Sequence, residues 1–145
     1  MHKGEVIEML EEYELLLRVD GMDGKAAMVG MAAQSIREVE SIPPDPMQID
    51  GIGPFFREMI VDFQMKGTNE ELEELRRWYP YARELTQVDG IGPTLARRLH
   101  DHIGVTTVRD LLDVDLTEVR GVGDATADAI RMSAMSVMLA EHASE

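Results

Sequence analysis

The 145-residue chain contains no cysteine, so it can form neither disulfides nor thiolate metal sites, and it offers no cysteine nucleophile. No apolar run approaches the roughly 20 residues that a membrane-spanning helix needs. The first residues become acidic and amphipathic too early for a signal peptide. We therefore expect a cytoplasmic protein that makes no contact with membranes. The hydrophobic content of 44% is sufficient for a stable core.

Basic residues are also scarce, with 14 Lys and Arg against 28 Asp and Glu and a net charge of −14. Nucleic-acid binders usually gain affinity by neutralising phosphates with Lys and Arg, so this composition counts against such a role. The charge is uneven: residues 1–74 hold 17 acidic and 6 basic side chains, whereas residues 75–145 hold 11 and 8. The second half is the better candidate for phosphate contact, and the acidic first half could meet a basic protein partner. A carboxylate-rich surface with only three lysines is also typical of adaptation to high salt.

Helical periodicity dominates the chain, and no alternating stretch predicts a strand. Apolar residues at steps of three and four predict a helix over residues 5–19, and Gly21 and Gly24 indicate a break before a second helix over residues 26–39. Thr68 followed by Glu71 resembles a capping box and predicts a helix over residues 69–78. A weaker signal of the same kind comes from Thr107 and Asp110. Methionines at apolar helical positions are expected to fill the core: Met28, Met31, Met132, Met135 and Met138.

The most informative pattern is an internal repeat. Three segments align without gaps: IDGIGPFFREMI (49–60), VDGIGPTLARRL (88–99) and VRGVGDATADAI (119–130). Paired glycines allow unusual backbone angles and close approach, and the apolar residue between them can plug the core. Pro54 and Pro93 then suit the first turn of a helix. Each copy predicts a hairpin that opens onto a helix N-terminus, where free N–H groups can bind phosphate.

Segment 88–112, VDGIGPTLARRLHDHIGVTTVRDLL, resembles the helix-hairpin-helix of family X DNA polymerases, the polymerase beta-like enzymes. Residues 4–40 resemble the helices that open the N-terminal lyase domain of that family, and the first repeat resembles the hairpin of that domain. The second and third repeats equally resemble the paired-hairpin domain of many DNA repair proteins. We expect an all-α fold with a lyase-domain-like helical bundle over residues 1–76, containing hairpin one, and a paired helix-hairpin-helix DNA-binding domain over residues 80–140.

The resemblance does not imply catalysis by this chain. No segment can serve as the polymerase palm domain, and the lysine with which the family's lyase domain attacks the sugar is matched by Met59. A phosphate-binding lysine of the family is matched by Phe55, while Lys25 keeps a family lysine that contacts the 5′ phosphate. In hairpin one Arg57 stands where the other copies have alanine, which predicts a distorted hairpin. We therefore expect no enzyme activity.

The expected function is sequence-independent DNA binding, on nicked or gapped DNA among others, in repair or replication. The alternative is a protein-protein interaction module derived from a family X N-terminal region. Hairpin two is expected to contribute more than hairpin three, because Asp124 places a carboxylate where hairpin two has Pro93. By the same resemblance, K⁺ or Na⁺ would bind the carbonyls of Thr86, Val88 and Ile91, and no other cofactor is expected. The expected DNA-binding residues are Lys25, Gly51, Gly53, Gly90, Ile91, Gly92, Thr94, Arg97, Arg98, Gly121, Val122 and Gly123.

Overall fold

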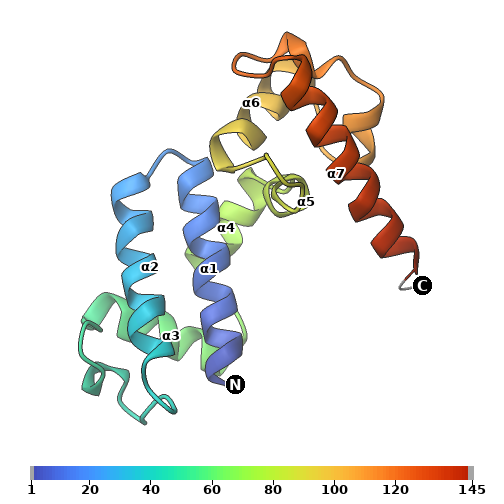
Figure 1. The fold of residues 1–145 in the computed structure, drawn as a ribbon. Helices are drawn as coiled ribbons and strands as arrows, with labels where there is room; N and C mark the ends of the chain where they lie inside the picture. Colours follow the sequence, from blue (N-terminus) through green and yellow to red (C-terminus); the bar gives the residue numbers. More distant parts are fainter. Residues whose placement is uncertain (1, 144–145) are drawn as a thin grey trace. The chain divides into compact units, whose positions relative to one another are not determined.

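The computed structural model describes residues 2–143, within which the chain forms seven α-helices, three short 3₁₀ helices and no strand (Figure 1). The expected all-α fold class is confirmed. The chain divides into two compact units, unit 1 (Met1–Trp78) and unit 2 (Tyr79–Glu145). Within the described residues, none of the helices combines the length and the apolar character that crossing a membrane requires.

Unit 1 contains α1 (Lys3–Val19), α2 (Asp23–Arg37), η1 (Pro46–Gln48), α3 (Pro54–Lys66) and α4 (Glu70–Trp78). Helices α1 and α2 pack side by side, and α1 also contacts α3 and α4 (Figure 1). The apolar face predicted for the first helix forms much of this core, since Val6, Leu10, Tyr13, Leu16 and Leu17 are buried.

Two predicted helix boundaries in unit 1 are wrong by a few residues. Gly21 has a φ of +84° in the turn after α1, but Gly24 lies in the first turn of α2 rather than in the break. The cap of α4 is Asn69, whose Oδ1 accepts hydrogen bonds from the N–H groups of Glu71 (2.9 Å) and Leu72 (3.4 Å). Asparagine is among the best N-cap residues, so Asn69 takes the place predicted for Thr68.

A partly buried ion pair connects α1 and α4, the first and last helices of unit 1. The guanidinium of Arg76 on α4 contacts both carboxylate oxygens of Glu12 on α1, with Nε–Oε2 at 2.6 Å and Nη2–Oε1 at 2.7 Å. Arg76 Nη1 also lies 2.6 Å from Glu73 Oε1. Only 7% of the Glu12 side chain is exposed. The hydrogen bonds to Glu12 raise the pKa of Arg76 most, and the contact with Glu73 raises it further.

Unit 2 contains α5 (Ala82–Thr86), α6 (Pro93–Ile103), η2 (Arg109–Leu112), η3 (Leu116–Glu118) and α7 (Asp124–Ala143). Helix α5 packs on α6, and α7 packs on η2 and η3. The predicted start signal at Thr107 is confirmed: the Asp110 N–H donates to Thr107 Oγ1 (3.2 Å), and the Thr107 N–H donates to Asp110 Oδ2 (3.1 Å). The backbone N–H groups of Thr106 and Thr107 lower the pKa of Asp110 by stabilising its carboxylate.

Five methionines were expected to fill the core. Four of them are exposed, so the expectation is wrong for these four. Met28 and Met31 on α2 are 59% and 71% exposed, and Met132 and Met135 on α7 are 71% and 53% exposed. The buried positions of α2 and α7 are instead mainly alanines. Small side chains let these helices approach their neighbours closely, and the methionines lie on the opposite faces.

Candidate nucleic-acid interface

The three repeats form three nearly identical turns. The first glycine of each copy has a left-handed backbone, with φ values of +92° (Gly51), +93° (Gly90) and +93° (Gly121). One hydrogen bond of 3.1 Å closes each turn, from the N–H of Ile52, Ile91 or Val122 to the carbonyl three residues earlier. A positive φ at the third position is what a type II turn requires, so glycine is needed at these three positions by the fold itself.

The second glycine of each copy is the N-cap of the following helix, and the fold does not require it. Gly53 and Gly92 have φ values of −95° and −94° with extended ψ, a conformation open to any residue. A Cβ atom built on Gly53, Gly92 or Gly123 would have no atom within 4 Å. Serine, threonine, aspartate or asparagine would cap a helix better than glycine does. The space beside these glycines is therefore open to something outside the chain.

The helix starts after these glycines carry free donors. In hairpin two the first intrahelical bond runs from the Ala96 N–H to the Gly92 carbonyl (2.9 Å). The N–H groups of Gly92, Thr94 and Leu95 precede it and donate no hydrogen bond within the described residues. Hairpin three has the equivalent first bond, from Ala127 to Gly123 (2.9 Å). Free donors and the positive end of the helix dipole make both starts suitable for an anion.

Hairpin one keeps the turn but buries a different residue in the first turns of the helix that follows. Its turn angle and closing hydrogen bond equal those of the other copies, so the predicted distortion of the hairpin is wrong. Ala96 and Ala127 are buried, whereas Arg57 at the same position is exposed and lies 3.3 Å from Asp45. Phe56, one residue earlier, is buried instead. The larger arginine is thus accommodated by burying a different residue of α3, not by changing the hairpin.

The repeat begins earlier in the chain than the glycine pattern suggests. Asp45, Glu84 and Asp115 stand at equivalent positions six residues before the first glycine, each followed by a buried residue: Pro46, Leu85 or Leu116. Asp45 and Asp115 cap the short helices η1 and η3 through the N–H two residues on, at 3.1 Å and 3.0 Å. Aligning segments 45–60, 84–99 and 115–130 would have located the first helix of each motif from the sequence.

Hairpins two and three pack against each other within unit 2. The Asp89 N–H in the turn of hairpin two donates to Ser133 Oγ on α7, at 2.8 Å. A Cβ on Gly90 would lie 3.5 Å from Ile130 on the same helix. In the reverse direction, a Cβ on Gly121 would lie 3.6 Å from the Nη1 atom of Arg98 on α6. Each turn therefore lies against the helix of the other hairpin.

The basic residues expected at the interface differ in their partners. Arg97 lies 3.4 Å from Asp101 and 5.6 Å from the centre of the Tyr79 ring. Arg98 is exposed and forms no ion pair within the described residues. Lys25, in unit 1, lies 2.5 Å from Glu71 and 5.3 Å from the centre of the Phe55 ring. Of the three cations, only Arg98 has a charge without an acidic partner.

The base of hairpin two is rigidly packed. The ring of Tyr81, which is 3% exposed, stacks on His100 with centroids 3.9 Å apart. His100 Nδ1 lies 3.1 Å from the Val105 carbonyl, which connects α6 to the loop after it. Burial, and then the nearby Asp101 carboxylate, raise the pKa of Tyr81 to about 12. The aromatic pair thus holds α6 against the start of α5.

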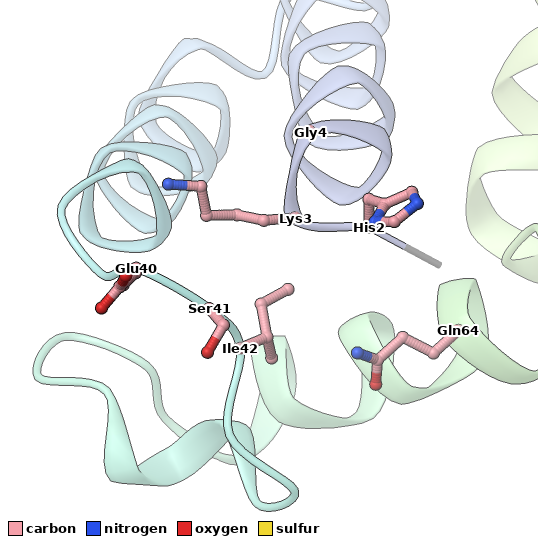
Figure 2. Close-up of a pocket in the computed structure, with 7 residues that line it drawn as sticks. All are labelled: His2, Lys3, Gly4, Glu40, Ser41, Ile42 and Gln64. Atoms are coloured by element: carbon pink, nitrogen blue, oxygen red, sulfur yellow. The ribbon is translucent and has the colours of Figure 1, made fainter.

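A pocket of about 320 Å³ in unit 1 is lined by His2, Lys3, Gly4, Glu40, Ser41, Ile42 and Gln64 (Figure 2). The Lys3 ammonium donates to the carbonyls of Val39 (2.8 Å) and Arg37 (3.3 Å). It therefore caps the C-terminal end of α2 rather than serving the pocket. The described residues contain no group of three or more side chains that could hold a metal ion, here or elsewhere.

Unit 2 thus consists of two helix-hairpin-helix motifs packed as a pair. Residues 82–136 match the family described as SAM-like helix-hairpin-helix tandem. The match includes hairpins two and three and excludes hairpin one. No curated protein matches the sequence. A helix-hairpin-helix domain indicates nucleic-acid binding as a general function of unit 2.

Proposed function

We propose that unit 2 binds DNA without regard to base sequence, in repair or replication, by holding phosphates of the minor groove at hairpins two and three. The observation that carries this proposal is the pair of second glycines, Gly92 and Gly123. Apart from the adjoining residues, no atom of residues 2–143 lies within 4 Å of a Cβ added to either glycine, and the helix starts that they cap are suited to anions. Backbone donors position a phosphate without reading bases. They also do not depend on a basic surface, which accommodates the charge of −14.

A side chain at either second glycine should block the phosphate without disturbing the fold. We expect Gly92→Val and Gly123→Val each to weaken DNA binding about tenfold or more, the range expected when one or two hydrogen bonds to a charged group are lost. Fluorescence anisotropy with labelled duplexes of two unrelated sequences measures the loss, and circular dichroism checks the helicity.

Gly24→Val is the matched control, because Gly24 also has no atom within 4 Å of an added Cβ and belongs to α2 of unit 1, not to a hairpin. Its DNA affinity should equal that of the wild type. Unchanged affinity in both hairpin variants would rule out the backbone contact. Absence of DNA binding by the wild type would instead favour a protein partner, reached through the acidic unit 1.

We also propose that hairpin two accepts a monovalent cation, K⁺ or Na⁺, at the carbonyls of Thr86, Val88 and Ile91. The carbonyls of Thr86 and Ile91 accept no hydrogen bond within the described residues, whereas that of Val88 accepts one from the Ile91 N–H (3.1 Å). Neutral carbonyl oxygens suit a weakly bound alkali cation. Such a cation would offset the negative charge near the bound phosphate.

We propose that unit 1 is a scaffold derived from a family X lyase domain and that it has no lyase activity. Met59 is buried in α3 and has no amine, and the ammonium of Lys25 is paired with Glu71. We expect no covalent adduct when the protein is treated with borohydride and an incised abasic DNA. Mass spectrometry of the intact protein measures this. An adduct that disappears in Lys25→Ala would identify Lys25 as a nucleophile and contradict the expectation.

A further inference from the structure

We propose that Arg98, which belongs to the helix of hairpin two, acts at hairpin three, where its guanidinium contacts the phosphate that the turn and helix start of hairpin three hold. The inference rests on the proposed DNA binding and assigns a separate role to each hairpin. Hairpin two holds its phosphate with backbone donors and no side-chain charge, whereas hairpin three adds side-chain charge. The sequence by itself pairs Arg98 with its own hairpin.

The guanidinium of Arg98 lies beside the turn of hairpin three. Arg98 lies on α6, eight residues after Gly90, yet its Nη1 atom lies beside Gly121, 3.6 Å from where a Cβ would be. The glycine has no side chain that could separate this guanidinium from a ligand at the turn. Arg98 is exposed and has no carboxylate partner within the described residues, so its charge is available.

The charged side chains at hairpin three differ from those at hairpin two. Hairpin three has Asp124 at its helix start, which would repel a phosphate. It also has Arg120 in the turn, where hairpins one and two have Asp50 and Asp89. Together with Arg98, these side chains give hairpin three a net charge of about +1 by formal counting. Arg98 therefore offsets the carboxylate that would otherwise weaken this contact.

Hairpin two shows the opposite balance. Its turn contains the exposed Asp89, its helix starts with the uncharged Pro93, and Arg97, the other arginine of α6, is paired with Asp101 at 3.4 Å. The contacts at hairpin two are therefore made by uncharged N–H groups. Since counterion release follows phosphate neutralisation by cations, the salt dependence of binding should come mainly from hairpin three.

The test is a double-mutant comparison on the full chain by fluorescence anisotropy with a labelled duplex at several salt concentrations. We expect Arg98→Gln to weaken binding about threefold to tenfold at low salt and to reduce the salt slope by about 0.9, the loss of one phosphate contact. In the Gly123→Val background, Arg98→Gln should have no further effect. In the Gly92→Val background it should keep its full effect.

The control is Arg109→Gln, since Arg109 is also exposed and without an ion pair but lies on η2. It should change neither affinity nor slope. The proposal is overturned if the effect of Arg98→Gln persists in Gly123→Val, or if it disappears only in Gly92→Val. A wild-type protein that binds no DNA would contradict the proposed function itself. Failure of the proposed function is thus distinguished from failure of the role assigned to Arg98.

Discussion

Replacing Arg76 by methionine is expected to lower the free energy of unfolding by about 1.5–3 kcal/mol, because it removes the positive charge and the two hydrogen bonds that Arg76 gives to the buried carboxylate of Glu12. Glu12 is the one charged side chain among the buried residues of the described chain, and Arg76 contacts both of its oxygens. Methionine keeps most of the aliphatic length of arginine, so the loss measures charge more than packing. Urea unfolding followed by circular dichroism measures the change.

Arg77→Met provides the matched control, since Arg77 is exposed, adjacent to Arg76 and without an ion pair within the described residues. Its effect should stay within about 0.5 kcal/mol, as is usual for surface substitutions. The double variant Glu12→Gln with Arg76→Met should recover part of the stability, because the buried charge that Arg76 stabilises is then removed together with Arg76. Equal effects of Arg76→Met and Arg77→Met would show that the ion pair does not stabilise unit 1.

This ion pair also shows what the sequence could not predict. Glu12 and Arg76 are 64 residues apart, and nothing in the sequence distinguishes either of them from the other charged residues of an amphipathic helix. The turns of the hairpins were predictable because the requirement is local: a positive φ demands glycine at a fixed position relative to the apolar residues. The placement of Arg98 at Gly121 was not, because it depends on how two hairpins pack.

The errors within helices have a related cause. Periodicity identified the helices over residues 3–19 and 23–37, yet it misplaced the buried face of α2 and α7. These helices pack mainly through alanines and expose several methionines, so the size and hydrophobicity of the methionines favoured the wrong face. Hairpin one was misjudged for a similar reason, because the neighbours of α3 bury Phe56 and leave Arg57 in solvent while the hairpin keeps its geometry.

Leu99→Ala is expected to destabilise unit 2 by about 2–5 kcal/mol, the range for a leucine deleted from a packed core. Leu99 is fully buried and stands nine residues after the first glycine of hairpin two, where Ile60 and Ile130 stand in the other copies. All three side chains are 0% exposed, so the residue at this position belongs to the core beside each hairpin. Urea unfolding followed by circular dichroism measures the loss.

Leu95→Ala is the control, because Leu95 lies one turn earlier on the same helix and is only partly buried. It should lose clearly less stability than Leu99→Ala. The comparison also separates stability from binding, since Leu99 offers no group to phosphate whereas Gly92 contributes no packing. In conditions where Leu99→Ala remains folded, its DNA affinity should match that of the wild type, while Gly92→Val should bind weakly at nearly full stability. If Leu99→Ala loses affinity while fully folded, the hairpin geometry is set by the core beneath it and not by the turn alone.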